Sequence, residues 1–261
     1  MTIERLIGMV HLPALPGSPS WDGTPITQIA DMALADVLVL ERAGFDGAMI
    51  QNSLDRPTRM RVDQLTVALM SAVLTRIRLA SELTLGVNVV KNDGPAAVVI
   101  AAAAGAQFVR VKALTGTRMS AEGIITGCAF ETMAIRRDSG ARPAIWADVR
   151  EPTSWPLAEA SFAADVADTL ELGAADAIVV TGHDERSTFQ FAKEARQLRP
   201  DAHLIIGGRV NAANVVRAFE HANTVIIGSA LKAEPGIRGR NDLAASVAIA
   251  EAARSGTATA R

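Results

Sequence analysis

Short apolar runs alternate along the whole chain with longer stretches of helical periodicity, and this alternation narrows the choice of folds more than any other feature. The apolar runs lack regular polar alternation, so both faces of each strand should be buried, as in a parallel sheet. We predict strands at residues 6–12, 47–52, 84–90, 108–114, 144–149, 177–181, 203–207 and 225–228. We predict helices at residues 26–43, 63–81, 95–104, 121–137, 157–172, 188–198, 212–222 and 243–254.

Eight strand–helix units in 261 residues predict an α/β protein with a single (β/α)8 TIM barrel. The main alternative, a doubly wound open sheet, usually begins with a GxGxxG turn, which is absent here. No linker or low-complexity block divides the chain, so we expect one domain over residues 1–261, with a frayed tail at 255–261. Helix caps are expected at Gly44, Gly105, Gly140, Gly173, Asn211 and Asp242.

Composition argues against several classes of function. A net charge of −2 and few aromatic residues disfavour a nucleic-acid partner, because phosphate backbones attract clustered Lys and Arg. The lone cysteine, Cys128, allows no internal disulfide and favours a cytoplasmic location; its helical context indicates a packed residue. We expect no signal peptide and no transmembrane segment, since the apolar run 96–105 is far short of the ~20 residues that span a bilayer.

His11 ends the first predicted strand, and Pro13, Pro16 and Gly17 follow it. Active sites of barrels form at the carboxyl ends of the strands, so His11 is expected at the mouth, under a loop stiffened by proline. A histidine at this place is either functional or a hydrogen-bond partner of a neighbouring loop.

Two glycine-containing loops follow the last two predicted strands. Barrels often bind phosphate at these loops, where glycines let the backbone approach an anion. Charged and hydroxyl side chains there can add hydrogen bonds to an anion. The alternative is that the glycines only allow tight turns. We predict a phosphate site formed by Gly207, Gly208, Arg209, Gly228, Ser229 and Lys232.

Polar residues also occur at the ends of the other predicted strands. Lumen-facing and outward-facing residues alternate along a barrel strand, and a charge facing the apolar helix layer is costly. We therefore expect a polar layer at the mouth, although ion pairs within the lumen, such as Lys112 with Asp148, would also account for it. The predicted substrate-binding members of this layer are Asn52, Asn88, Arg110, Arg150 and Thr181.

Four residues are candidates for chemistry. Asp148 is the best general base, or the ligand of Mg²⁺ or another divalent metal if the site holds one. Lys112 is the candidate general acid or electrostatic stabiliser, and a Schiff base on its amine is a further alternative. His11 and His183 are candidate residues for relaying a proton. A zinc hydrolase is disfavoured, because HExxH and an initial His-x-His are absent.

The chain resembles the BtpA family, which includes the SgcQ-like proteins. The matching stretches follow the chain in order: GMVHLPALPGSPSWDG, GVNVVKND, FVRVKALTG, EGIITG, WADV, IVVTG, IIGGRVNAANV and IIGSALK. The resemblance implies a TIM-type barrel. It also implies either a part in accumulation of photosystem I, which gives the family its name, or a part in sugar utilisation.

This sequence departs from the family pattern around the expected mouth. Gln51-Asn52 stands where members often carry Glu-Asn, residues 150–154 replace a loop rich in His and Lys, and residues 183–186 replace a turn rich in Gly, Ser and Thr. These differences suggest a different substrate or a changed metal requirement.

Two functions are compatible with these features. The first is an enzyme acting on a phosphorylated sugar or related small metabolite, as a lyase, isomerase or hydrolase, and assembled as a homo-oligomer. The second is a non-enzymatic biogenesis or stability factor for a membrane complex, which would need an exposed apolar or basic docking surface. No single stretch of the sequence shows such a surface.

Overall fold

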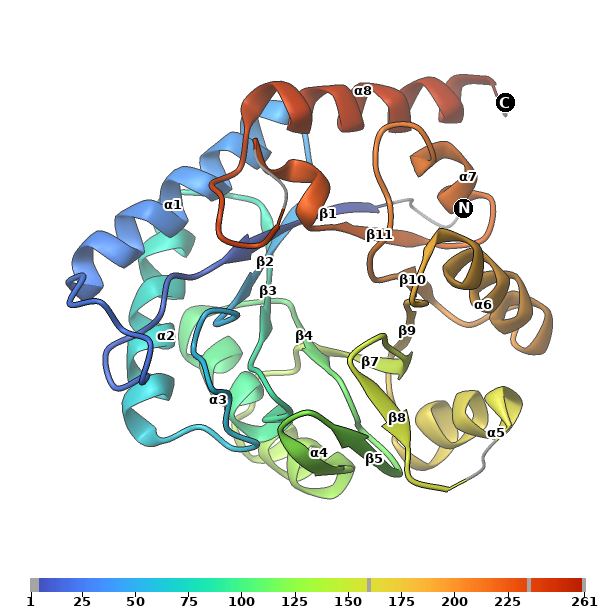
Figure 1. Cartoon of the computed structure of the whole chain (residues 1–261), viewed down its shortest axis with the longest axis horizontal. Coiled ribbons are helices and arrows are strands. Elements are labelled where there is room, and N and C mark those ends of the chain that lie inside the picture. The colour runs from blue at the N-terminus through green and yellow to red at the C-terminus, as the bar shows by residue number, and fades with distance from the viewer. Residues whose placement is uncertain (1–4, 159–160, 234–235, 260–261) are drawn as a thin grey trace.

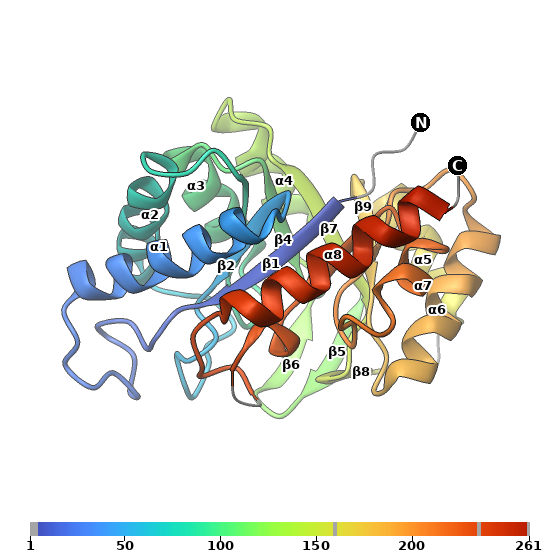
Figure 2. The ribbon, with the colours of Figure 1, turned by 90° about the horizontal axis from the view of Figure 1, so that it is seen from above.

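The computed structural model describes residues 5–158, 161–233 and 236–259, and in these residues eight parallel strands close into a barrel. Figure 1 looks along the barrel, with helices surrounding the strands, and Figure 2 shows the same ribbon turned by 90°. The barrel strands are β1 (Arg5–His11), β2 (Gly47–Gln51), β3 (Thr84–Asn88), β4 (Phe108–Val111), β7 (Ala144–Arg150), β9 (Ala177–Val180), β10 (Leu204–Ile206) and β11 (Thr224–Ile227). The predicted TIM barrel is therefore confirmed.

The helices follow the strands in the order that the sequence predicts. They are α1 (Ile26–Ala43), α2 (Gln64–Arg78), α3 (Gly94–Ala104), α4 (Ala129–Asp138), α5 (Phe162–Ala167), α6 (Glu185–Leu198), α7 (Val215–Phe219) and α8 (Leu243–Thr259). One π-helical turn (Asp168–Leu172) continues α5, and a short 3-10 helix (Ser229–Leu231) follows β11. No helix in the described part of the chain is long and apolar enough to cross a membrane.

A second, small sheet departs from the prediction. Strands β5 (Thr117–Ser120), β6 (Gly123–Thr126) and β8 (Ser154–Pro156) form an antiparallel sheet in the order β6-β5-β8. The predicted helix 121–137 is therefore wrong over its first part, and α4 begins only at Ala129. The predicted helix 157–172 likewise begins later, at Phe162, where the Ser161 side chain caps the helix by accepting from the Ala164 amide.

Several cap predictions are confirmed and others are not. Gly44 and Gly105 end α1 and α3 with positive φ. Gly173 has φ −75°, and the left-handed conformation falls on Ala174 instead. Asp242 accepts a hydrogen bond from the Ala245 amide at 2.8 Å.

The remaining caps and the chain end differ in detail. Gly140 has φ 68° and lies one residue beyond the Ser139 cap of α4. Asn214, not Asn211, occupies the cap position of α7. Helix α8 extends to Thr259, beyond its predicted end, while residues 260–261 of the predicted tail lie outside the described residues. The single domain stays a prediction.

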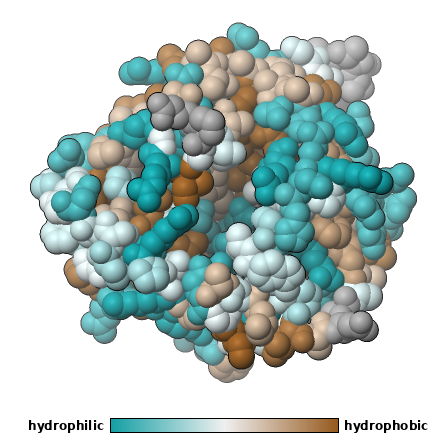
Figure 3. All heavy atoms as spheres, viewed as in Figure 1, coloured by the Kyte–Doolittle hydropathy of each residue, from teal (hydrophilic) through white to brown (hydrophobic). Residues whose placement is uncertain are grey.

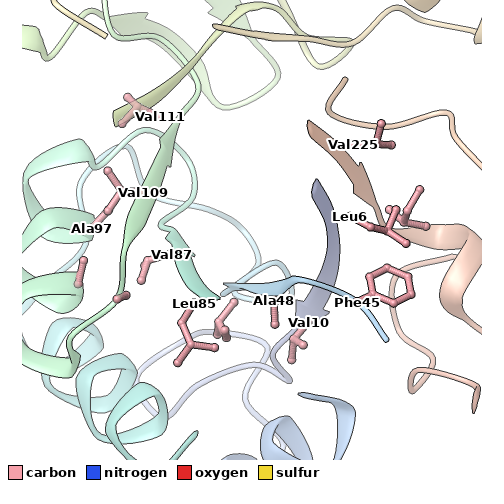
Figure 4. Close-up of a cluster of buried hydrophobic side chains, with 14 of the residues drawn as sticks. Leu6, Val10, Phe45, Ala48, Leu85, Val87, Ala97, Val109, Val111 and Val225 are labelled. Carbon is pink, nitrogen blue, oxygen red and sulfur yellow. The ribbon is translucent and has the colours of Figure 1, made fainter. Parts of the chain in front are cut away.

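The outward-facing strand residues pack against the helices in one continuous apolar layer. Figure 4 shows part of it, including Val10, Ala48, Leu85, Val87 and Val109. Each fully buried Val or Leu side chain contributes roughly 1.5–3 kcal/mol relative to exposure. This layer therefore supplies most of the apolar burial that holds the barrel closed.

A separate apolar cluster fills the lower lumen. Its members are Ile7, Met9, Met49, Phe108, Trp146, Ala177, Val179, Ile205 and Ile226. The rings of Phe108 and Trp146 stack with centroids 3.6 Å apart and planes inclined by 13°. Gly86 on β3 makes room for this pair, because a Cβ there would overlap the Phe108 ring.

We expect Gly86→Ala to lower the free energy of unfolding by about 1–3 kcal/mol, since the added methyl group overpacks the lumen. Chemical denaturation measures the difference. Gly208→Ala is the matched control, because its Cβ would meet its nearest neighbour at an ordinary 3.4 Å, and its expected effect is below about 0.5 kcal/mol. Equal stability of the two variants would contradict this packing role for Gly86.

Candidate active site at the carboxyl end of the barrel

A ring of polar residues and glycines closes the upper lumen, directly above the apolar cluster. Strand alternation places it there: Ile7 and Met9 point inward on β1, as does Met49 on β2, and the next inward position lies two residues further on. The ring consists of His11, Gln51, Asn88, Arg110, Asp148, Thr181, Gly207 and Gly228. In Figure 3, which looks onto this end of the barrel, hydrophilic residues gather around the centre of the face.

Arg110 and Asp148 form a buried, bidentate ion pair within this ring. Arg110 Nε lies 2.9 Å from Asp148 Oδ2, and Arg110 Nη2 lies 2.7 Å from Asp148 Oδ1. The Asp148 side chain has no exposed surface. Burial raises the pKa of Asp148, and the Arg110 guanidinium opposes that change. The predicted pairing of Lys112 with Asp148 is therefore corrected: Arg110 takes both carboxylate oxygens.

The same guanidinium reaches across to the loop after β10. Arg110 Nη1 lies 3.5 Å from the Gly207 carbonyl oxygen. A Cβ at Gly207 would lie 2.8 Å from Arg110 Nη2 and 2.6 Å from Thr181 Oγ1. Glycine is needed at this position because the guanidinium and the threonine hydroxyl occupy that space. Thr181 Oγ1 is buried and has no hydrogen-bond partner among the described residues.

Lys112 belongs to a second charged group beside this pair. Its Nζ lies 3.5 Å from Glu151 Oε2 and 3.3 Å from Thr153 Oγ1. Lys91 Nζ reaches the same hydroxyl at 3.1 Å and pairs with Glu122 at 3.0 Å. Burial lowers the pKa of Lys112. Although burial raises the pKa of Glu151, the Lys112 ammonium and hydrogen bonds from Ser154 and Thr153 lower it to about 2.

His11 lies on β1, and β1 is on the opposite side of the closed barrel from β7. Its Cε1 would contact a Cβ at Gly228 at 3.8 Å, so the histidine faces the loop after β11. His11 Nδ1 is buried and has no partner among the described residues. Burial, aided by Lys232, lowers the pKa of His11 to about 3, so the imidazole is neutral near pH 7.

The loops after β10 and β11 border a groove of about 720 Å³. Its polar lining comes from several elements: His183, Asp184, Glu185, Arg209, Asn211, Ser229 and Lys232. Arg209 is exposed, with φ 65°, whereas Lys232 is buried and its Nζ lies 2.8 Å from Asn241 Oδ1. Both predicted phosphate loops therefore border one groove, although the Lys232 ammonium is already engaged by Asn241.

Two predicted binding residues point away from the lumen. Asn52 is fully buried, donates to Asp55 and accepts from the Val90 amide, so it organises the surrounding loops. Arg150 pairs with Asp165 of α5 at 2.7 Å, because a β-bulge between Asp148 and Arg150 interrupts the alternation that would have placed both inward. Neither position supports the predicted contact with a substrate.

The other predicted residues lie at the mouth. Asn88 donates to the Arg110 carbonyl oxygen at 2.7 Å. His183 is exposed at the rim, and its ring stacks on Trp155 of β8 with centroids 6.5 Å apart.

Gln51, Lys91 and Glu151 complete the site, and none of them was among the predicted site residues. Gln51 follows Gly47 and Met49 on the inward face of β2, so strict period-two counting would have found it in place of Asn52. Lys91 and Glu151 lie just beyond the ends of β3 and β7, where no strand periodicity applies.

The described residues contain no group of three or more His, Cys, Asp or Glu side chains that could hold a metal ion. Asp148, the predicted metal ligand, has both oxygens bonded to Arg110. Cys128 is buried in the packing between α3 and α4, as expected.

Asp148→Asn would leave the Arg110 guanidinium buried beside a neutral amide. We expect it to lower the free energy of unfolding by about 3–5 kcal/mol, as for other broken buried pairs. Chemical denaturation measures this change. Asp31→Asn is the control, because it breaks an exposed pair with Arg76 and should leave stability nearly unchanged. A cost for Asp148→Asn no larger than that of the control would argue against a tightly held pair.

The neutral His11 makes stability depend on pH in a definite direction. Its pKa is about 3 in the fold against an ordinary 6.5, so between these values the unfolded chain binds more protons. The free energy of unfolding should therefore fall as pH drops below about 6.5, by up to about 1.4 kcal/mol per pH unit from this group. We expect His11→Gln to flatten the stability–pH curve of the wild type across that interval, and an unchanged slope would disprove the assignment.

Comparisons with known proteins agree with this architecture. The model of the BtpA family matches residues 2–255. The Photosystem I biogenesis protein BtpA of Synechocystis is 33% identical, covering 88% of this chain and 81% of that protein. An uncharacterised protein of Thermococcus kodakarensis is 36% identical, covering 89% of each chain.

Solved structures share the fold at low sequence identity. The native KDPGal structure has a TM-score of 0.59 and 19% identity, covering 97% of this chain and 96% of the other. The N-(5'-phosphoribosyl)anthranilate isomerase of Pyrococcus furiosus has a TM-score of 0.56 and 13% identity, covering 96% and 99%. By its family match and its curated relatives, this chain belongs to the BtpA family.

Proposed function

We propose that this chain is an enzyme that acts on a phosphorylated sugar or a related small metabolite, as a lyase, isomerase or hydrolase. The observation that carries the proposal is the groove between the loops after β10 and β11, which adjoins the polar ring at the mouth. A single substrate molecule would place its phosphate in the groove and its reacting group above the polar ring.

The phosphate would be held by backbone and side-chain donors of the two loops. Gly208 and Gly228 leave space beside their backbones, Ser229 offers a hydroxyl, and the exposed guanidinium of Arg209 can make charge-assisted bonds. Lys232 adds positive charge from a position fixed by Asn241. These donors border a groove of about 720 Å³, which the carboxylates of Asp184 and Glu185 also line.

The reacting end would face Arg110, Lys112 and His11. The Arg110 guanidinium can stabilise an oxygen that gains negative charge, and it is already oriented by Asp148. We therefore propose that Asp148 positions Arg110, instead of serving as the base we expected. His11 can donate or accept one hydrogen bond through its unpartnered Nδ1, and His183 can exchange protons at the rim.

Structures of the same fold support the class of substrate. N-(5'-phosphoribosyl)anthranilate isomerase and thiamine phosphate pyrophosphorylase, both from Pyrococcus furiosus, are barrels of this kind whose names contain phosphorylated compounds. Their low identity, 13% and 9%, makes them guides to the substrate class alone. The homo-oligomer, the cytoplasmic location and a role for Mg²⁺ stay predictions.

A second candidate function is a biogenesis factor that docks on a membrane complex, as the name of the Synechocystis relative suggests. One observation favours it: Phe130 and Leu172 are 84% and 77% exposed and line one groove of about 930 Å³. The sequence shows no such surface, since these residues lie far apart in the chain. Exposed apolar surface of this kind often marks protein contacts.

Gly228→Asp should weaken phosphate binding, because the carboxylate would lie beside His11 and repel the anion. We expect at least tenfold weaker binding of inorganic phosphate, measured by calorimetry or ³¹P NMR. Gly228→Ala is the matched control, since its Cβ would make ordinary contacts of 3.6 and 3.8 Å and should preserve binding. If the wild type binds no phosphate, or Gly228→Asp binds it as well as Gly228→Ala, the phosphate site is wrong.

The two candidate functions respond to different variants. Phe130→Asp combined with Leu172→Asp should leave phosphate binding unchanged if the chain is an enzyme of the proposed class, because the apolar groove lies outside the polar ring. The biogenesis function predicts instead that the double variant loses accumulation of a membrane complex in cells, while Gly228→Asp does not.

A further inference from the structure

We propose that Lys112 is a covalent catalytic residue, whose Nζ forms an imine with a carbonyl group of the substrate. This inference rests on the proposed function and narrows it to carbonyl chemistry at the same mouth. Three arrangements support it: the contact of Lys112 with Glu151 at the end of β4, the adjacent ammonium of Lys91, and the unpartnered oxygen of Glu151.

Lys112 directly follows the end of β4, and its Nζ contacts Glu151 and Thr153 in the connection after β7. Its side chain is 15% exposed, so most of the side chain is covered and a small part of it reaches solvent. Its ion pair with Glu151 is long, at 3.5 Å, so the amine is held loosely. Desolvation of this kind favours the neutral amine, which is the nucleophilic form.

Lys91 places a second positive charge next to Lys112. Both ammonium groups donate to the Thr153 hydroxyl, at 3.1 and 3.3 Å. Lys91 is the more closely paired of the two, because its Nζ lies 3.0 Å from Glu122 whereas Lys112 lies 3.5 Å from Glu151. Two like charges in contact with one hydroxyl favour loss of a proton from the less tightly paired group, which is Lys112.

Glu151 lies where a proton acceptor is needed. Its Oε2 contacts Lys112 Nζ and the Thr153 hydroxyl, the latter at 2.6 Å. Its Oε1 is buried and has no hydrogen-bond partner among the described residues. That oxygen is available to a hydroxyl of a bound molecule. The carboxylate also becomes a stronger base as Lys112 loses its charge, since that charge holds the pKa of Glu151 down.

The proposed step balances within these groups. Glu151 accepts a proton from the Lys112 ammonium, and the neutral amine attacks the carbonyl carbon to give a carbinolamine. Glu151 then returns the proton to the carbinolamine hydroxyl, which leaves as water as the C=N bond forms. The ammonium and the ketone or aldehyde thus become a protonated imine and one water, with Glu151 unchanged.

Trapping with sodium borohydride tests the proposal on the full chain. Dihydroxyacetone phosphate is the probe and unphosphorylated dihydroxyacetone its matched control, with the modified peptide identified by mass spectrometry. We expect a reduced adduct on Lys112 that forms at least tenfold faster with the phosphorylated compound. Lys112→Arg should lose the adduct.

Two variants of Lys91 distinguish an electrostatic effect of Lys91 on Lys112 from a purely structural role. Lys91→Gln should slow trapping at Lys112 about tenfold, because loss of the neighbouring charge raises the pKa of Lys112, whereas Lys91→Arg should preserve the rate. A purely structural role for Lys91 predicts equal trapping in both folded variants.

The outcomes also distinguish this inference from the proposed function. Binding of inorganic phosphate without a Lys112 adduct from either compound would overturn the imine and leave the phosphate site standing. Equally fast adducts from both compounds, with no phosphate binding, would keep the imine and overturn the phosphate site. Labelling of other lysines that persists at full yield in Lys112→Arg would also overturn the imine.

Discussion

The buried pair of Arg110 and Asp148 is the interaction on which the arrangement of the mouth depends. Two charges removed from water are costly unless each satisfies the other, and here both carboxylate oxygens are bonded to one guanidinium. The pair joins β4 to β7, and through the Gly207 carbonyl it also reaches β10. The pair therefore holds one side of the polar ring in place, next to Lys112 and Glu151, which follow β4 and β7 directly.

Much of the fold could be predicted because the physical rules behind it are local. A strand buried on both faces leaves an apolar run, and each of the eight barrel strands overlaps such a run. Alternation along β4 and β7 also placed Arg110 and Asp148 on the inward face, whereas His11 and Asn88 were expected at the mouth because they lie at or near the ends of predicted strands. The same rule, counted strictly along β2, selects Gln51 and rejects Asn52.

Other parts depend on contacts that no local pattern encodes. The bulge in β7 turns Arg150 outward, and no residue of the run 144–149 marks the position of that irregularity in the sequence. Strand register alone does not select Arg110 as the partner of Asp148, because it sets Arg110 opposite Trp146; the long guanidinium side chain reaches Asp148 from there. Phe130 and Leu172, which are far apart in the sequence, line one groove only because the fold places α4 and the π-helical turn after α5 around it.

The small antiparallel sheet has a consequence for how members of this family can diverge. Strands β5 and β6 belong to the connection after β4, while β8 belongs to the connection after β7. In the described residues, β8 pairs with β5. Replacing only one of the two connections would therefore leave backbone amides and carbonyls of the other without hydrogen-bond partners. New specificities on this side of the barrel should therefore arise by joint exchange of both connections, as one inherited unit.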